Sequence, residues 1–387
     1  MRRVVLILVW LVFVFLLLQL AGFVFYKLEV SKPVSGYGYP AGLIVAHPQL
    51  GYSYQPNYSG HFKGTAYHDV PIEINAQGFR DADFAAQPGD GKRVAVLGDS
   101  VVFGAGVSPQ DRFTDCLDGA GGTGQGAGWR ILNLGVNSYS FGHYLTLAQL
   151  NFLGAKPDAV LIGITLNDFQ PMEEVGLARR MRRHESGLHT PNWLARIGDR
   201  IERTYAVRFI HEIDNRFSYA MLNADEREEY HTKWMRSVVK GWRSDDNTQF
   251  FAGQLDELTA LLDRADIPFG FVVFPELNDL KHPDEFGGPR NTVLGLLKQR
   301  NLHYCDPYAA FAVDAVANQM AVESLFLDRD SIHYSPAGHR VLCAAVEHCI
   351  QDTDLAGLAG PLSAPPSTRS PSHSAPLIQS RPEAVGP

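Results

Sequence analysis

The sequence predicts an α/β fold, a three-layer α/β/α sandwich built around a central parallel sheet. From residue 93 onward, short β-rich apolar runs alternate with helical patterns, which is typical of repeated βαβ units. The runs are almost continuously apolar, as expected for strands that are buried on both faces. Strands are predicted at 94–97, 131–134, 159–164 and 268–274, with a shorter one at 303–306.

The segments between these strands predict the two helical layers. Helices are expected at roughly 139–153, 250–265, 290–300 and 338–351, because each segment carries an apolar stripe with the helical period. Residues 170–250 interrupt the alternation and are interpreted as a long, mostly helical insertion. Together these elements define a core domain over 91–352.

The first thirty residues predict a transmembrane helix. Residues 4–25 are apolar except for Gln19, and at ~1.5 Å per residue they can cross a ~30 Å hydrocarbon core. Arg2 and Arg3 precede the run, which places the N-terminus in the cytoplasm and the rest of the chain on the periplasmic side. The alternative is a cleaved signal peptide, although the run exceeds the usual h-region.

Two further segments flank the core domain. Residues 31–90 are rich in Tyr, Gly and Pro and predict an extended N-terminal subdomain, with a strand signal at 72–75. Residues 353–387 are rich in Pro, Ser and Ala, so they cannot bury enough apolar surface to offset the entropy of ordering and are expected to be disordered.

Composition excludes several classes of partner. The net charge of −8 argues against a nucleic-acid-binding protein, which would need an excess of basic residues. The four cysteines show none of the spacings that build a zinc site, so no metal centre is expected. No organic cofactor is expected either. Cys343 and Cys349 lie six residues apart in a predicted helix and face different sides, so any disulfide is expected to use Cys116 or Cys305.

A candidate nucleophile follows the first core strand. Ser100 ends the segment Gly98-Asp99-Ser100, and the carboxyl end of a parallel strand is where ligands bind in such sheets. Serine is also a favoured helix N-cap, and for an isolated Gly-Asp-Ser that interpretation is the simpler one. Catalysis therefore requires a base elsewhere in the chain.

A candidate base lies near the end of the core domain. Asp330 precedes His333 by three residues, so its carboxylate can turn back and hold the Nδ1–H while Nε2 takes a proton from serine. Gly135, through its backbone N–H, and Asn167, through its amide, end the next strands and can stabilise an oxyanion.

Neighbouring polar residues are given structural roles. Asp99 is expected to fix the turn before Ser100, and Asp168 to order its own loop. Asp328 and His339 fall out of phase with the Asp-x-x-His unit.

These four blocks, in this order and spread over about 93–350, resemble the SGNH (GDSL-type) hydrolase superfamily. The resemblance implies a flavodoxin-like fold, with Ser100 as nucleophile and first oxyanion donor, Gly135 and Asn167 as further donors, His333 as base and Asp330 as its orienting group. The third block departs from the usual Gly-x-Asn-Asp, because Thr165 stands at the glycine position. This change is expected to affect substrate choice more than chemistry.

The segment 75–80, Asn-Ala-Gln-Gly-Phe-Arg, resembles exported bacterial members of this superfamily that are similar to glycan O-acylation enzymes. The predicted function is a membrane-anchored serine esterase acting on an O-acyl ester linked to carbohydrate or lipid. Two alternatives stay open: an O-acyltransferase to a surface glycan with the same triad, and a non-catalytic glycan-binding scaffold.

The insertion contains two groups of candidate contact residues. Four arginines either contact an anionic membrane surface or an acidic glycan, or form a solvated helix face. Four aromatic residues are expected to pack the insertion onto the core and not to form an acyl pocket. The residues are Arg179, Arg180, Arg182 and Arg183, and Trp193, Tyr205, Phe209 and Phe217.

Overall fold

The computed structural model describes residues 2–29, 39–40, 42–62, 70–84, 91–118, 128–175, 178, 204–207, 210, 217, 221–317, 321–328 and 330–353. The predictions for the four arginines, for Trp193 and Phe209, and for the tail beyond Thr353 lie outside the described residues. Of the other two aromatic residues of the insertion, Tyr205 is half-buried and Phe217 is exposed, so Phe217 does not pack onto the core as expected.

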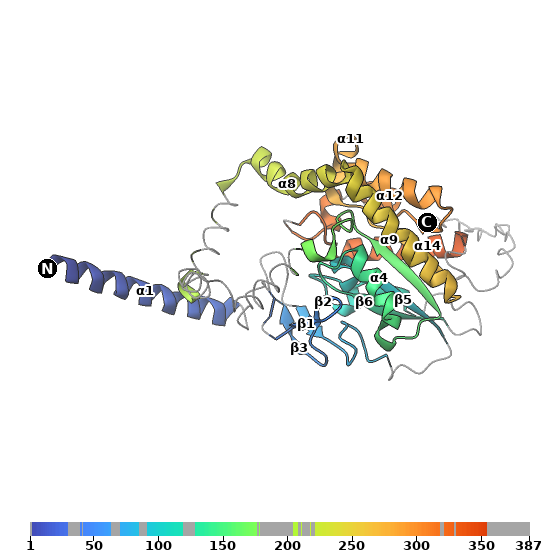
Figure 1. Ribbon diagram of the computed structural model, residues 1–387. Coiled ribbons are helices and arrows are strands. Elements are labelled where there is room, and N and C mark those ends of the chain that lie inside the picture. Colours follow the sequence, from blue (N-terminus) through green and yellow to red (C-terminus); the bar gives the residue numbers. More distant parts are fainter. Residues whose placement is uncertain are drawn as a thin grey trace, which may run out of the picture.

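A five-stranded parallel sheet with the order β6-β5-β7-β8-β9 forms the centre of the molecule (Figure 1). Each strand lies where an apolar run predicted one, although β9 is only two residues long. The strands are β5 (Lys92–Gly98), β6 (Trp129–Gly135), β7 (Ala159–Ile164), β8 (Phe269–Val273) and β9 (Tyr304–Cys305). The predicted central parallel sheet is confirmed.

Successive side chains of each strand point to opposite faces of the sheet, so the core is divided into two clusters, one on each face. In β5, Ala95 and Leu97 contribute to one cluster, whereas Val94 and Val96 contribute to the other. Because apolar side chains on both faces need a cover, helices pack on both, which confirms the three-layer α/β/α architecture.

Each face of the sheet has its own set of helices. The first cluster includes residues of α4 (Phe141–Gln149), α8 (Ala224–Trp242), α9 (Asp245–Arg264) and α12 (Gly288–Gln299). The second includes residues of α2 (Ser100–Phe103), α3 (Phe113–Leu117), α10 (Leu277–Lys281), α13 (Tyr308–Ala317) and α14 (Pro336–Thr353). The short α11 (Pro283–Phe286) precedes α12.

The segment predicted as an N-terminal subdomain contains two small antiparallel sheets. The first pairs β1 (Ile44–His47) with β2 (Gly51–Tyr54), and the second pairs β3 (Ser59–Phe62) with β4 (Val70–Glu73). The Tyr52 hydroxyl donates to Asn137 O, and Asn137 N donates to the Tyr54 hydroxyl, each at 2.9 Å. Both tyrosines are fully buried within the first cluster, so this subdomain shares the core of the α/β body.

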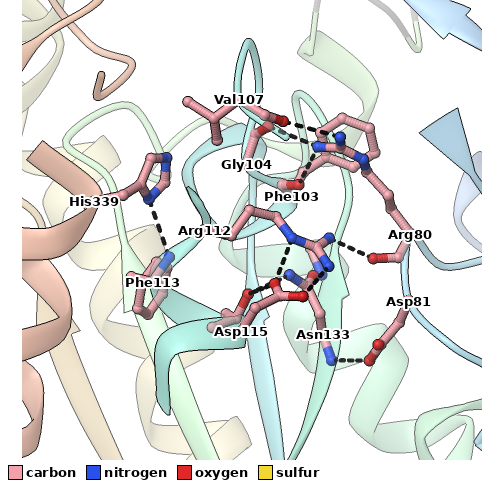
Figure 2. A network of polar contacts seen from close by, with 12 residues as sticks. Arg80, Asp81, Phe103, Gly104, Val107, Arg112, Phe113, Asp115, Asn133 and His339 are labelled. Carbon is pink, nitrogen blue, oxygen red and sulfur yellow. Dashed lines mark hydrogen bonds and ion pairs between the residues drawn. The ribbon is translucent and has the colours of Figure 1, made fainter. Parts of the chain in front are cut away.

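Arg80, the last residue of the Asn-Ala-Gln-Gly-Phe-Arg segment, is a buried anchor for the chain that follows Ser100. Its guanidinium donates to the carbonyl oxygens of Gly104 and Val107 at 2.8 and 2.9 Å, as Figure 2 shows. It also donates hydrogen bonds to the carbonyl oxygens of Phe103 and of Pro71 in β4. Burial, the largest cause, and the charge of Arg112 lower the pKa of Arg80 to about 9, so the side chain is still charged at neutral pH.

We expect Arg80→Met to lower the free energy of unfolding by about 2–5 kcal/mol, because the carbonyl groups of Gly104 and Val107 would lose their donor in a buried site. Urea denaturation measures this loss. The matched control is Arg264→Met on the exposed surface of α9, which should leave the midpoint unchanged. Equal midpoints for both variants would contradict the anchoring role.

Two disulfides fasten the C-terminal helix α14. Cys116 of α3 pairs with Cys343, and Cys305 of β9 pairs with Cys349. Each bridge uses Cys116 or Cys305, as the spacing of Cys343 and Cys349 indicated.

The N-terminal helix α1 (Arg2–Glu29) contains a 23-residue span, Arg2–Val24, and an 18-residue window within it has a mean hydropathy of 3.1. This span is long and apolar enough to cross a membrane, and a signal sequence passes the same test. The Phe23 ring contacts the Tyr205 ring edge-on, with their centroids 5.5 Å apart.

Candidate active site

The turn between β5 and α2 presents Ser100. Asp99 is the N-cap of α2, and its Oδ1 accepts a hydrogen bond from Val101 N at 2.9 Å. Gly98 is required just before it, because a Cβ there would lie 2.1 Å from Val102 Cγ2. Ser100 is the first helical residue and not the cap, so the competing interpretation of this serine as a capping residue does not apply. Asp99 has the turn-fixing role predicted for it.

Ser100, His333 and Asp330 lie in one hydrogen-bonded chain. Ser100 Oγ is 2.8 Å from His333 Nε2, and His333 Nδ1 is 2.6 Å from Asp330 Oδ2. The other oxygen, Asp330 Oδ1, accepts the backbone N–H groups of Ile332 and His333 at 2.9 and 3.0 Å. Because this turn fixes the carboxylate, Oδ2 faces the imidazole. Residues 233 positions apart are thus brought within hydrogen-bonding distance.

The surroundings of His333 favour its protonated form. Burial, the largest cause, lowers the pKa, but the charge and hydrogen bond of Asp330 and the charge of Asp99 outweigh it and raise the pKa above the ordinary value of 6.5. The pKa of Asp330 is lowered: burial, the largest cause, raises it, but His333 and the two backbone N–H groups outweigh burial. An ionised Asp330 can therefore hold the Nδ1–H of a neutral imidazole.

This shift predicts a pH dependence. A base must be neutral, so the reactivity of Ser100 should fall as the pH drops through the raised pKa of His333, which puts the acid limb above about pH 6.5. The rate of covalent labelling of Ser100, measured between about pH 5 and 9, tests this expectation. Protonation of His339 cannot cause this fall in rate, since burial lowers the pKa of that residue to about 3. A flat profile would argue against His333 as base.

The two oxyanion donors that are predicted besides Ser100 differ in availability. The Gly135 N–H is already donated to Asn133 Oδ1 at 2.9 Å, so this group is not free to bind an oxyanion. The close packing of Gly135 explains the glycine, because a Cβ there would lie 2.3 Å from Phe103 N. For Gly135 the expected role therefore has to be corrected from donor to packing residue.

Asn167 is the donor that stays available. It follows β7, and within the described residues its Nδ2 donates no hydrogen bond, while its Oδ1 is buried without a partner. Ser138, which no sequence pattern singled out, has φ +63° in the loop after β6. In the described part of this loop, the N–H groups of Val136, Asn137 and Tyr139 have acceptors, whereas that of Ser138 has none.

The neighbouring polar residues have structural contacts. Asp168 accepts Thr165 N at 3.0 Å and so orders its own loop, as predicted. His339 is buried, stacks on Phe113 and accepts its N–H at 3.4 Å, as Figure 2 shows. Asp328 is exposed. Within the described ranges, no three His, Cys, Asp or Glu side chains gather closely enough to hold a metal ion.

Comparison with known proteins finds matches among solved structures. No protein-family model and no curated protein matches the sequence. A G-D-S-L family lipolytic protein from Desulfitobacterium hafniense is 12% identical, with a TM-score of 0.37 over 67% of this chain and 99% of its own. A catalytic mutant of an acetylxylan esterase from Geobacillus stearothermophilus is 17% identical, with a TM-score of 0.34 over 68% and 95%.

A third solved structure, the lipase/acylhydrolase from Enterococcus faecalis, is 12% identical, with a TM-score of 0.36 over 67% of this chain and 95% of its own.

Proposed function

We propose that this protein is a serine esterase that cleaves an O-acyl ester through an acyl-Ser100 intermediate. The observation that carries the proposal is the Ser100–His333–Asp330 chain, with distances of 2.8 and 2.6 Å. A pure binding protein has no need of a histidine held between a serine hydroxyl and a buried carboxylate. The geometry therefore favours an enzyme over the scaffold alternative.

The proposed reaction begins with attack of Ser100 Oγ on the acyl carbonyl carbon, while its proton passes to His333 Nε2. Asp330 stabilises the imidazolium that forms. The developing oxyanion is held by the Ser100 N–H, the Asn167 amide and, in our revised assignment, the Ser138 N–H. His333 then gives the proton to the departing alcohol, the tetrahedral intermediate collapses, and water releases the acyl group by the reverse sequence.

The acyl donor is proposed to be linked to carbohydrate or lipid, because residues 75–80 resemble a segment of exported glycan-modifying proteins.

We further propose that α1 stays in the membrane as a single-pass anchor, with the α/β body on the periplasmic side. Arg2 and Arg3 at the N-terminal end of the span and two disulfides in the body support this orientation, since disulfides persist in oxidising compartments. Release of the body into the soluble fraction would instead indicate a cleaved signal sequence.

Covalent labelling tests the proposed function without knowledge of the substrate. The full chain, solubilised in mild detergent, is exposed to a fluorophosphonate probe, and the labelled residue is identified by mass spectrometry. Labelling is expected at Ser100 and should be lost in Ser100→Ala and His333→Ala. The matched control is Ser331→Ala, which removes a different serine hydroxyl from the same loop as His333 and should keep the label. A folded wild-type protein without label at Ser100 would overturn the proposal.

A further inference from the structure

A buried chain of three polar side chains lies beneath Ser100. Thr165 Oγ1 is 3.0 Å from Asp99 Oδ2 and 3.0 Å from Asp168 Oδ1. All three residues are at least 97% buried. The threonine is the residue that departs from the sequence pattern of the third block, and here it joins the carboxyl group before the nucleophile to the carboxyl group of the next loop.

The number of hydrogens in this chain favours one protonated carboxyl group. A threonine hydroxyl has one proton and can donate only one hydrogen bond, whereas an ionised carboxylate can only accept. If Asp99 and Asp168 were both ionised, one of the two 3.0 Å contacts would join two acceptors. Within the described residues, no lysine or arginine forms an ion pair with either group to offset two buried charges.

The surroundings place the proton on Asp168. Burial, the largest cause, raises the pKa of both carboxyl groups, and the charge of Asp99 raises that of Asp168 further. For Asp99, the Val101 N–H, the charge of His333 and the hydroxyls of Thr165 and Ser100 oppose burial. For Asp168, the Thr165 N–H and the hydroxyls of Thr165 and Tyr144 oppose burial, but no positive charge does. Asp99 is therefore the better anion. The hydrogen bonds then run from the Asp168 carboxyl to Thr165 Oγ1 and from the Thr165 hydroxyl to Asp99 Oδ2.

We propose that Asp168, Thr165 and Asp99 form a hydrogen-bonded chain that holds one proton on Asp168 and keeps Asp99 ionised, and that Thr165 is a positioning residue for the Asp99 charge. Asp99 Oδ2 lies 3.3 Å from Ser100 Oγ, so this charge sits beside the reacting pair. It favours the imidazolium that His333 becomes when it takes the serine proton. The inference rests on the proposed function, which gives His333 that role.

Other titratable groups around Asp99 do not replace Thr165 as a donor to Oδ2. Glu276 is a buried acid whose pKa is raised by burial, the largest cause, and by acidic neighbours that include Asp99. The groups that interact with Asp99 are His333 from the loop before α14, Asp168 and Glu276 from the loops after β7 and β8, Tyr144 from α4, Tyr52 from β2 and Tyr334.

Infrared difference spectroscopy tests where the proton lies, independently of activity. At neutral pH the wild-type protein should show the C=O stretch of a protonated, buried carboxylic acid. The difference between wild type and Asp168→Asn should contain this band, whereas the difference between wild type and Asp99→Asn should not. If Glu276 is protonated, its band is present in the wild type and in both variants, so it cancels in each difference spectrum. A band that is lost in Asp99→Asn and kept in Asp168→Asn would overturn the assignment.

The pH profile of Ser100 labelling tests the role of Thr165. Thr165→Val removes the donor to Asp99, so the pKa of Asp99 rises and the negative charge beside His333 is lost. The fall in labelling rate at low pH should then move to lower pH, and the plateau rate should be about tenfold lower. Thr165→Ser keeps the hydroxyl and should restore the wild-type limb. Thr259→Val, which removes a buried hydroxyl from α9, is the matched control and should change neither.

A double variant links the two residues. If Thr165 acts through the charge of Asp99, adding Thr165→Val to Asp99→Asn should not move the acid limb any further. Identical limbs for wild type and Thr165→Val would overturn the inference and leave the esterase proposal intact. Absence of wild-type labelling at Ser100 would instead overturn the proposed function, and the infrared result would still decide the protonation of Asp168.

Discussion

Asp330→Asn is expected to lower kcat for a small activated ester by about 10³–10⁴-fold with little change in KM. The reason lies in how the carboxylate is held. Asp330 Oδ1 accepts two backbone N–H groups, from Ile332 and His333, so the carbonyl oxygen of an asparagine would keep that position. The asparagine Nδ2 would then face His333 Nδ1 as a donor. The imidazole would have to carry its proton on Nε2, where it could no longer accept the proton of Ser100.

The matched control for this prediction is Asp328→Asn, an exposed aspartate two residues earlier in the same loop. It should leave kcat at the wild-type value, because Asp328 is out of phase with His333. Thermal unfolding of both variants checks that the loop is intact. Full activity of Asp330→Asn, with an unchanged melting temperature, would show that Asp330 does not set the tautomer of His333.

Removal of the Cys116–Cys343 disulfide has the largest expected effect on stability. The bridge closes a loop of 227 residues, and the loss of loop-closure entropy in the unfolded chain corresponds to about 5 kcal/mol. We expect the double variant Cys116→Ser, Cys343→Ser to unfold at a much lower guanidinium concentration than wild type. Guanidinium denaturation, followed by tryptophan fluorescence under non-reducing conditions, measures the shift.

The second bridge is the matched comparison. Cys305–Cys349 spans 44 residues, for which the same relation gives about 4 kcal/mol. The double variant Cys305→Ser, Cys349→Ser should therefore lose slightly less stability, because the unfolded chain is less restricted by the shorter loop. If neither variant shifted the midpoint, the two bridges would not constrain the unfolded chain as proposed.

The strands and the polar blocks of the site could be predicted because they are local patterns. A strand buried on both faces leaves an apolar run, and β5, β7 and β8 all lie on such runs. His333 and Asp330 form a unit within one turn, so a three-residue spacing is enough to suggest it. Residues 176–177 and most of 179–220 of the predicted insertion lie outside the described part of the chain.

Other features could not be predicted because they depend on contacts between distant segments. A buried arginine carries no local signal, and Arg80 becomes an anchor only because the segment after α2 turns its carbonyl groups toward it. The same is true of Gly135. Its position at a strand end suggested an oxyanion donor, but the Asn133 side chain folds back and takes its N–H.

The sequence by itself determined the α/β class, the order of the strands along the chain, the apolar N-terminal span and the residue types of the site, since each is a matter of composition, period or short spacing. Only the tertiary structure decided that Ser100 meets His333, that Asp99 and Asp168 share the Thr165 hydroxyl, and which cysteines pair. Hydrogen bonds and disulfides require distances of a few ångströms between specific atoms, and chain folding alone sets such distances for residues far apart in sequence.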